Sequence, residues 1–356
     1  MMLTKLLQRS RQTFGLDVQG VSRTLRTDDR QTLLDAMLRE KVAINHLCLV
    51  GECGSCRCRL VSGRVKLKRD ISAVIDQADL ARGHLLACQS LALSDVEIAV
   101  PGLGGEAPAD EPAVAATISG MRRLADNVIE LTLSPERPIT YRAGQFARLT
   151  FPEILDLAGI TRCYSFADAP GEEDHLLRFN VRHVPGGRFT DWLFAADRSG
   201  VRLAIAGASG SFGYHASDRP IVCIAGGTGL APIRAILRDL VRAGRTLDVT
   251  LMLAARSQRD LYGTDDIGAL ASQWKGQFAL LPVLSEEPAS SEWQGRRGFC
   301  TEYLAELGDL SAHDFYLCGP PAMIDAVTEQ LRGVVPDTQI HIDRFLDQST
   351  DTQASM

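Results

Sequence analysis

The sequence predicts a protein of several domains and mixed class: a small α+β domain, then an antiparallel β-barrel, then a doubly wound parallel α/β sheet. Three observations predict this order. The 356 residues are too many for one ordinary core. A segment rich in Pro, Gly, Ala and acidic residues, 101–112, has almost no apolar bulk and is typical of a linker. Short alternating strands follow it, and from about residue 217 apolar strands alternate with helices.

The same changes of pattern give the expected domain boundaries. Gly and Pro separate the short strands of the barrel, whereas later strands are apolar throughout, as strands buried on both faces are. We expect a first domain at 12–100, a linker at 101–112, a barrel domain at 113–216, an α/β domain at 217–346 and a polar tail at 347–356.

The first domain is expected to open with strands near 14–27, followed by a helix near 30–40. Asp28 or Asp29 is the expected N-cap of this helix, because a short acidic side chain can accept the free backbone N–H groups of the first turn. The apolar side chains on one face of the helix are Leu33, Leu34, Met37 and Leu38.

In the later domains, the period of the apolar residues changes from two to a helical spacing. Expected barrel strands are 114–118, 127–133, 145–150, 176–182 and 201–205. The α/β domain begins with a fully apolar strand, and a helix at 233–241 follows it. Expected strands of the parallel sheet are 221–225, 247–254, 278–283 and 315–318.

Composition excludes several classes of protein. The contents of 45% hydrophobic and 23% charged residues are those of a globular protein, and no apolar run is long enough to span a membrane. The start of the chain lacks the apolar core of a secretory signal. Nine cysteines, an odd number, argue against a secreted disulfide framework, so we expect a cytoplasmic protein with reduced thiols. A net charge of −6 argues against nucleic-acid binding.

The densest basic stretch of the chain is 57–69. Its alternation would place Arg64, Lys66 and Lys68 on one face of a strand. An ordinary solvated strand face is the simpler interpretation. A docking surface for an acidic redox partner is the alternative.

Four cysteines carry the most specific signal. Cys48, Cys53 and Cys56 have the C-x4-C-x2-C spacing of plant-type [2Fe–2S] sites, and Cys88 is the distant fourth ligand. Such a cluster carries one electron at a time. A zinc site is the alternative, but zinc sites favour paired C-x2-C hairpins. Cys58 lies two residues past the loop and is expected to be a packed thiol rather than a ligand.

Two motifs in the barrel are typical of flavin binding. In the first, Arg162-Cys163-Tyr164-Ser165, an aromatic ring can stack on a flavin and an arginine can pair with phosphate. The second is a Gly-Gly turn within 184–190 that leads into a helix at 191–195, and a helix N-terminus binds anions. Each motif alone is also compatible with an ordinary strand and an ordinary turn.

A glycine-rich loop, 226–232, directly follows the first apolar strand and opens a helix, as a pyrophosphate-binding loop does. Pro232 replaces the third glycine of the usual dinucleotide fingerprint. No acidic residue clearly ends the next strand, and Arg256 and Arg259 lie there instead. An arginine there can hold a 2′-phosphate, so NADPH stays open beside NADH, which we expect.

A last motif, Cys318-Gly319-Pro320-Pro321, sits at the C-terminal end of a predicted parallel strand, where ligands bind in open sheets. The alternative for Cys318 is a buried structural thiol. Taken in order, these motifs resemble the ferredoxin–NADP reductase superfamily. They resemble more closely its oxygenase-reductase branch, in which a plant-type ferredoxin domain precedes the reductase. The resemblance covers residues 12–346.

This resemblance implies a β-grasp [2Fe–2S] domain, an FAD-binding barrel and an NAD(P)-binding α/β domain. Arg162 would contact the flavin pyrophosphate, Tyr164 would stack on the isoalloxazine and Ser165 would hydrogen bond to flavin N5. Val181 and the turn Gly187–Thr190 would also contact FAD. Threonine stands at position 190 where serine is usual.

For the nucleotide, the resemblance implies that Thr228 and Gly229 meet the NAD pyrophosphate. Cys318 and Gly319 would line the nicotinamide pocket, and Phe345 would lie at the flavin. Ser165 and Cys318 are thus the candidate catalytic residues.

The electron count supports this arrangement. A nicotinamide gives two electrons as hydride and a [2Fe–2S] cluster takes one, so a flavin is expected between them. The implied activity is an NAD(P)H-dependent reductase that serves a terminal oxygenase, Rieske or di-iron, or a separate ferredoxin. The alternatives are a reductase for a deoxysugar dehydratase and a redox-sensing iron–sulfur protein.

Overall fold

The protein was analysed as a computed structural model that describes residues 12–42, 44, 51, 54, 56–69, 71, 74–75, 77–100, 113–157, 160–171 and 175–345. The chain forms two compact units, Met1–Asp110 and Glu111–Met356, which are treated separately below. The expected linker and the expected polar tail lie outside the described residues. Within the described residues, no helix combines the length and apolar character needed to cross a membrane.

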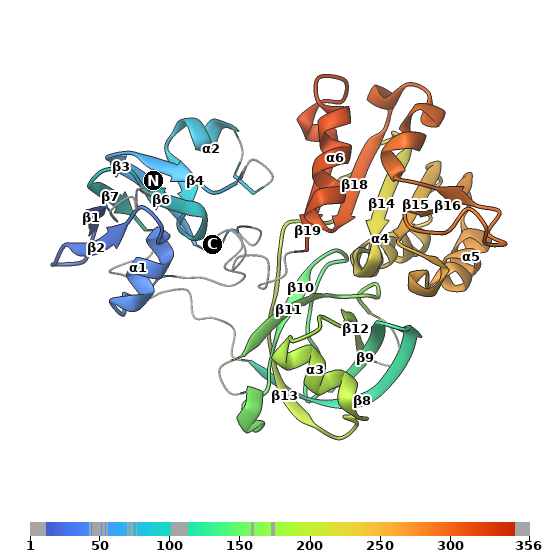
Figure 1. The fold of residues 1–356 in the computed structure, drawn as a ribbon, viewed down its shortest axis with the longest axis horizontal. Coiled ribbons are helices and arrows are strands. Elements are labelled where there is room, and N and C mark those ends of the chain that lie inside the picture. Colours follow the sequence, from blue (N-terminus) through green and yellow to red (C-terminus); the bar gives the residue numbers. More distant parts are fainter. Residues whose placement is uncertain are drawn as a thin grey trace, which may run out of the picture. The chain divides into compact units, whose positions relative to one another are not determined.

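The first unit is built around a five-stranded mixed sheet with the order β2-β1-β7-β3-β5 (Figure 1). Strand β1 runs antiparallel to β2 and parallel to β7, and β4 pairs with β6 in a separate two-stranded sheet. Its elements are β1 (Thr13–Val18), β2 (Leu25–Asp28), α1 (Leu33–Arg39), β3 (Arg57–Ser62), β4 (Val65–Leu67), α2 (Gln77–Ala81), β5 (His84–Leu86), η1 (Ala87–Gln89), β6 (Ser90–Ala92) and β7 (Val96–Ala99).

Helix α1 starts later than predicted. Its N-cap is Thr32, whose hydroxyl accepts from the backbone N–H of Asp35 at 3.1 Å, in a reciprocal capping box. The expected cap Asp28 instead accepts the N–H groups of Arg30 and Gln31, and so closes the turn before the helix. The helical face was predicted well: Leu33, Leu34 and Met37 are buried, and Leu38 packs against the same core.

The second unit begins with a six-stranded antiparallel barrel in the order β11-β10-β13-β8-β9-β12. A bridge between Phe166 and Phe179 joins the two ends of this order. All five expected strands are present, although β8 continues beyond the expected 118. The elements are β8 (Val114–Ala125), β9 (Val128–Pro135), β10 (Phe146–Thr150), η2 (Leu155–Leu157), β11 (Thr161–Ser165), β12 (Leu177–Arg182), α3 (Arg188–Ala195) and β13 (Arg202–Ser209).

The rest of the second unit is a six-stranded parallel sheet with the order β17-β16-β15-β14-β18-β19. Its edge strand β19 (Ile340–Arg344) was not predicted from the sequence. The other elements are β14 (Ile221–Gly226), η3 (Gly227–Gly229), α4 (Leu230–Arg242), β15 (Val249–Ala255), η4 (Gln258–Asp260), α5 (Thr264–Gln273), β16 (Phe278–Leu284), β17 (Arg296–Arg297), η5 (Cys300–Leu307), η6 (Leu310–Ala312), β18 (Asp314–Gly319), α6 (Pro321–Leu331) and η7 (Asp337–Gln339).

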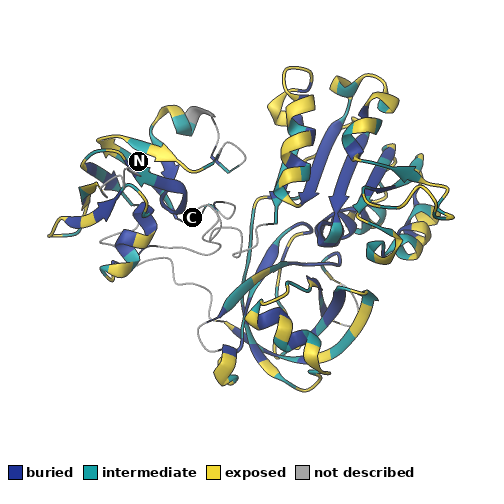
Figure 2. Ribbon diagram, viewed as in Figure 1, coloured by how far each residue is buried: buried dark blue, intermediate teal, exposed yellow. Residues whose placement is uncertain are grey.

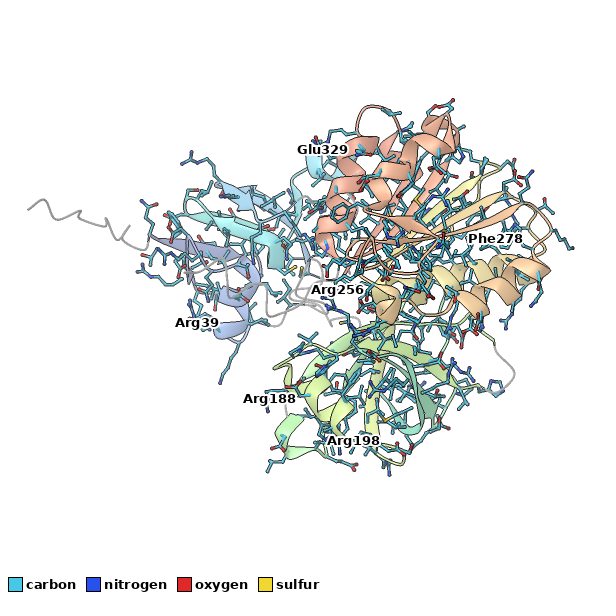
Figure 3. The ribbon with its side chains drawn as sticks, turned by 45° about the vertical axis from the view of Figure 1, so that its right-hand side comes forward. Arg39, Arg188, Arg198, Arg256, Phe278 and Glu329 are labelled. Atoms are coloured by element: carbon cyan, nitrogen blue, oxygen red, sulfur yellow. The ribbon has the colours of Figure 1, made fainter. Side chains whose placement is uncertain are left out.

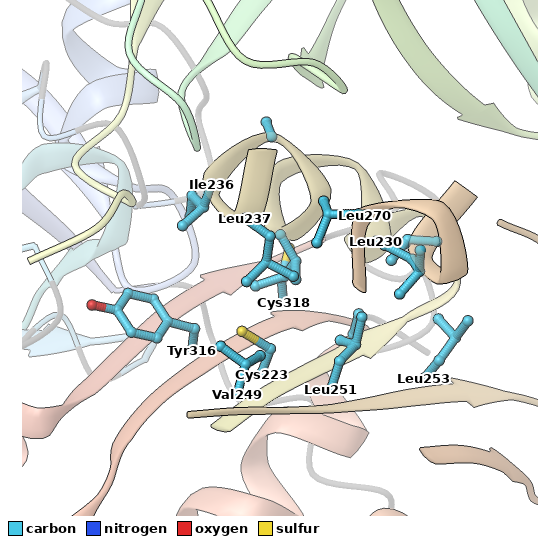
Figure 4. Close-up of a cluster of buried hydrophobic side chains, with 14 of the residues drawn as sticks. Cys223, Leu230, Ile236, Leu237, Val249, Leu251, Leu253, Leu270, Tyr316 and Cys318 are labelled. Atoms are coloured by element: carbon cyan, nitrogen blue, oxygen red, sulfur yellow. The ribbon is translucent and has the colours of Figure 1, made fainter. Parts of the chain in front are cut away.

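Both faces of this sheet are covered, as the apolar strands require. Every residue of β14 and β18 is buried, and Figure 2 shows the two strands as the dark centre of this part. Side chains from α4 and α5 pack on one face in the cluster of Figure 4, where Leu237 and Leu270 lie near Cys223 and Cys318. Side chains of η5 and α6 pack on the other face. The predicted fold class is confirmed, and the sheet places its loops at one carboxyl edge.

Candidate functional site

The first candidate centre lies in the first unit, where two of the predicted cluster ligands meet. Cys56, just before β3, and Cys88, in η1, are buried with their Sγ atoms 3.2 Å apart. The backbone N–H of Cys88 points at the Sγ atom of Cys56 at 3.5 Å, and Gln89 Nε2 lies 3.5 Å from the Sγ atom of Cys88. Donors aimed at sulfur stabilise thiolates, so this donor set fits an iron–sulfur cluster.

The backbone around these thiols also fits a tight ligand loop. Gly51 and Gly54 have φ values of +85° and +73°, which favour glycine. At Gly51 a Cβ atom would also lie 2.5 Å from the side chain of Gln89. The other two predicted ligands, Cys48 and Cys53, lie outside the described residues.

Cys58 shares the apolar core of the unit with Cys56 and Cys88. It lies on β3 and is fully buried. Burial, with a smaller effect of the nearby Cys88, raises the pKa of its thiol to about 12. Its position therefore favours a packing role.

The second candidate centre begins on β11, which carries the predicted flavin residues. Tyr164 is half-buried, and its ring lies 5.7 Å from the ring of Phe189, the second residue of α3. This contact brings the Arg162–Ser165 strand next to the Gly-Gly turn, as the two motifs require. Arg162 is half-buried, and its Nη1 donates to the carbonyl of Thr161 at 2.9 Å. Val181, on β12, is fully buried in the barrel core.

The turn before α3 is closed by the hydroxyl of Thr190. This hydroxyl accepts from the N–H of Val184 at 3.1 Å and donates to the carbonyl of Val184 at 2.9 Å. Helix α3 starts at Arg188, earlier than the predicted 191, and its N-cap Gly187 makes no side-chain cap hydrogen bond. Gly187 has no side chain to accept from the N–H groups of the first turn, and a helix start of this kind fits a phosphate. Arg188 (labelled in Figure 3) begins this helix.

The third candidate centre is the glycine-rich loop after β14. Gly227 has a φ of +54°, and the space where its Cβ would stand is open within 4 Å. Thr228 and Gly229 complete the short helix η3, which leads into α4 without a side-chain cap. An open backbone surface at a helix N-terminus fits a pyrophosphate.

Close packing ties this loop to the end of β18. A Cβ at Gly229 would overlap the carbonyl oxygen of Cys318, so only glycine fits there. A Cβ at Gly226 would lie 2.7 Å from Cδ of Pro320. Gly319, with a φ of +141°, abuts the backbone of Gly226 from the other side. The predicted pyrophosphate loop and the predicted nicotinamide motif therefore lie side by side.

Asp343 links the flavin strand to the nicotinamide strand, and sequence reasoning missed it. The thiol of Cys318, on β18, points at Oδ2 of Asp343 on β19 at 3.7 Å. The hydroxyl of Ser165, on the barrel, lies near the same carboxylate. Burial raises the pKa of Asp343 to about 7, although the thiol of Cys318 and the hydroxyl of Ser165 act to lower it. The two candidate catalytic residues are thus brought together at one titratable group.

Two further predicted residues lie at the carboxyl edge of the sheet, on different strands. Phe345 directly follows β19, is half-buried, and its N–H donates to the carbonyl of Gly319 at 2.9 Å. Arg256 (labelled in Figure 3) follows β15, is exposed, and forms an ion pair with Asp260 at 3.5 Å. The sequence shows only that Asp343 lies two residues before Phe345 and next to Arg344, which is no sign of burial.

The comparisons with known proteins agree with this geometry. A family model described as "2Fe-2S iron-sulfur cluster binding domain" matches residues 16–93. A second, "Oxidoreductase NAD-binding domain", matches residues 223–329.

Among curated proteins, the xylene/toluene monooxygenase electron transfer component of Pseudomonas putida is 41% identical over 93% of both chains. The reductase component of the naphthalene 1,2-dioxygenase system of the same species is 32% identical, over 88% of this chain and 93% of its own. Among solved structures, the ferredoxin reductase in carbazole 1,9a-dioxygenase matches 94% of this chain and 99% of its own, with a TM-score of 0.64 and 29% identity.

These similarities run through the cysteine centre, the barrel and the parallel sheet in one continuous alignment, so they concern the whole arrangement described above. They account for the [2Fe–2S] cluster, FAD and NAD(H) as the cofactors of this chain. The chain therefore belongs to the ferredoxin–NAD(P) reductases that carry an N-terminal [2Fe–2S] domain and act as electron-transfer components of oxygenase systems.

Proposed function

We propose that this chain takes hydride from NADH and delivers single electrons to the oxygenase component of a system that attacks aromatic hydrocarbons. The observation that supports the hydride step is that the thiol of Cys318 points at the carboxylate of Asp343, whose pKa the hydroxyl of Ser165 also acts to lower. The choice of acceptor is supported by the 41% identity to a xylene/toluene monooxygenase component. Relatives named for naphthalene dioxygenase and phenol hydroxylase support the wider class.

The residues of the chain have separate tasks in this proposal. When bound, FAD accepts a hydride from the nicotinamide and releases electrons singly to the cluster. Tyr164 holds the flavin ring by stacking, and Ser165 donates a hydrogen bond at the edge that receives hydride. Asp343 can hold or release a proton next to Ser165, because its pKa lies near neutrality.

The remaining binding roles follow the three centres. Arg162, Val181 and the Gly187–Thr190 turn hold the rest of FAD. The loop containing Thr228 and Gly229 binds the pyrophosphate of the nucleotide, Cys318 and Gly319 orient its nicotinamide, and Phe345 covers the flavin. Cys48, Cys53, Cys56 and Cys88 ligate the cluster.

For the domains we propose the boundaries predicted from the sequence: 12–100, 113–216 and 217–346, with a linker at 101–112. A cytoplasmic location is supported by the described cysteines, all of which are free thiols.

We propose NADH as the physiological donor. Arg256 would be the natural partner of a 2′-phosphate, but it already pairs with Asp260. Asp260 is also fixed by Ser257, whose hydroxyl donates to Oδ2 of Asp260 at 2.9 Å, so the carboxylate stays at this position. A fixed carboxylate beside the ribose disfavours a second negative charge and accepts hydrogen bonds from hydroxyls.

Anaerobic titration tests the proposal. The reconstituted protein is titrated with NADH and with NADPH while its visible spectrum is recorded. It is then mixed with a monooxygenase component of the xylene/toluene type, with a separate [2Fe–2S] ferredoxin, and with a deoxysugar dehydratase. Bleaching by NADH and fastest reoxidation by the oxygenase component are expected. Reoxidation only by the dehydratase, or bleaching without turnover as in a redox sensor, would contradict the proposed acceptor.

A further inference from the structure

The guanidinium of Arg234 joins the nucleotide-binding part to the barrel. Arg234 lies on α4, one turn beyond the glycine-rich loop, yet its side chain is only 3% exposed. Its Nε donates to the carbonyl of Ala167 at 2.9 Å. Its Nη2 lies 3.3 Å from Oε2 of Glu130 and 3.5 Å from Oδ1 of Asp168. Its Nη1 lies 3.0 Å from Oδ2 of Asp266 on α5. Three of the four partners belong to the barrel.

A second connection lies next to the first. The hydroxyl of Tyr262 accepts from Nδ2 of Asn180 at 3.2 Å and donates to the carbonyl of Gly227 at 3.1 Å. Asn180 is directly opposite Glu130 in the register of β9 and β12. Both connections therefore start from one cross-strand pair on the barrel. We call Glu130, Asn180, Arg234 and Tyr262 the interface network.

The interface network connects the strand proposed to hold the flavin with the loop proposed to hold the nucleotide. Ala167 lies two residues after Ser165, on the continuation of the flavin strand, and Asn180 precedes Val181. On the other side, Gly227 opens the pyrophosphate loop, and Arg234 begins the second turn of the helix that this loop starts. A shift of this network would move the flavin strand relative to the nucleotide loop.

The chemistry of the network favours a geometric role. A buried ion pair contributes little net stability compared with well-packed apolar residues, because its charges lose their hydration. A guanidinium, however, donates in fixed directions and holds several acceptors in one arrangement. Arg178 and Arg238 also form ion pairs with Asp168, so together with Arg234 three arginines contact this carboxylate.

We propose that Arg234 and Tyr262 are positioning residues that set the alignment of the nicotinamide with the flavin. This inference rests on the proposed function. Hydride transfer depends steeply on the distance between the two rings, and a misplacement of about 1 Å can cost up to 100-fold in rate. The interface network touches neither ring, and it acts through Ala167 and Gly227.

The test uses the holoenzyme with FAD and cluster bound. Arg234→Lys keeps the positive charge but loses the directed donors of the guanidinium. Tyr262→Phe removes only the hydroxyl from a buried ring. Each variant is mixed rapidly with NADH and with NADH deuterated at C4. We expect the limiting rate of flavin reduction to fall about tenfold in Arg234→Lys and about threefold in Tyr262→Phe. The long-wavelength absorbance of the stacked rings should weaken, and the dissociation constant for NADH should change less than twofold.

Matched controls lie elsewhere in the same unit. Arg245→Lys removes a guanidinium that bonds to Tyr214 and Ser217, and Tyr303→Phe removes a hydroxyl that bonds to the carbonyl of Arg297. Both controls should keep the wild-type rate and absorbance.

The inference is overturned if Arg234→Lys and Tyr262→Phe retain the wild-type rate and absorbance, even with lowered melting temperatures. It is also overturned if the controls lose as much rate as the network variants. Wild-type protein that NADH fails to bleach would instead overturn the proposed function itself.

Discussion

The hydroxyl of Ser165, on the antiparallel barrel, lies near the carboxylate of Asp343, on the last strand of the parallel sheet, and acts to lower the pKa of that carboxyl. These residues are 178 positions apart in the sequence, and each lies on a different part of the second unit. Their contact places a group with a pKa of about 7 beside the residue predicted to face the flavin.

Asp343→Asn removes the titratable group and keeps the shape of the side chain. We expect the rate of flavin reduction by NADH to titrate near pH 7 in the wild type and to become independent of pH in the variant. The limiting rate should fall about tenfold or more, since a positioned acid–base group contributes roughly 10²–10⁴-fold. Stopped-flow measurements from pH 5 to 9 check this. An unchanged titration in the variant would assign the proton to another group.

The same substitution should change stability in a pH-dependent way. The pKa of Asp343 is about 7 in the folded protein, above the ordinary value of 3.8 that it takes when unfolded. Between these values the folded protein binds more protons, so its stability falls as pH rises and the loss is complete above pH 7. Asp343→Asn should therefore gain melting temperature relative to wild type at pH 8, and gain less at pH 5. A difference that is the same at both pH values would contradict the shifted pKa.

Replacement of a cluster ligand should stop electron transfer through the cluster without stopping reduction of the flavin. In Cys53→Ser and Cys88→Ser we expect loss of the iron–sulfur absorbance and of electron transfer to a protein acceptor. Reduction of ferricyanide through the flavin should survive, because the flavin centre lies in the other unit. Cys58→Ala is the control and should keep the cluster spectrum, since Cys58 packs in the core. Equal loss of both activities would contradict the expectation that the flavin works independently of the cluster.

Thr190→Val should weaken FAD binding about tenfold, because the N–H and carbonyl of Val184 lose their partner in the phosphate turn. One lost buried hydrogen bond costs about 1–3 kcal/mol. Thr190→Ser keeps the hydroxyl and should bind FAD as the wild type does. Fluorescence titration of the apoprotein with FAD measures both. If Ser and Val variants bind equally, the hydroxyl does not hold the turn.

Gly229→Ala should abolish tight NADH binding. The new Cβ would overlap the carbonyl oxygen of Cys318, so the nucleotide loop must move away from β18. Gly268→Ala is the matched control: Gly268 lies inside α5, its Cβ would meet open space, and alanine favours a helix by about 1 kcal/mol. The control should bind NADH normally and melt slightly higher. Calorimetric titration with NADH distinguishes the two, and normal binding by Gly229→Ala would contradict the close packing.

Features carried by short segments could be predicted from the sequence. The cysteine spacing, the glycine-rich loop after an apolar strand and the change from barrel to parallel sheet are local patterns with a direct physical cause. The cap of α1 was predicted wrongly because Asp28 and Thr32 are both good capping residues, and their hydrogen bonds decide between them. The start of α3 at Arg188 was missed because Gly186 and Gly187, which are typical of a loop, directly precede it.

Long-range contacts could not be read from the sequence. An acidic residue near the end of a strand is usually solvated, so Asp343 gave no sign of burial until β19 paired with β18. Arg234 lies among apolar residues of a helix. The same pattern is seen where the aliphatic part of an arginine packs and its guanidinium is solvated. Only the contact of α4 with the barrel shows that the guanidinium of Arg234 is buried.

Strand β19 follows every other described element in chain order and carries Asp343. During synthesis the carboxylate therefore leaves the ribosome after the barrel and the glycine-rich loop. The contact between the barrel and Asp343 can therefore form only after every other described strand and helix has been made.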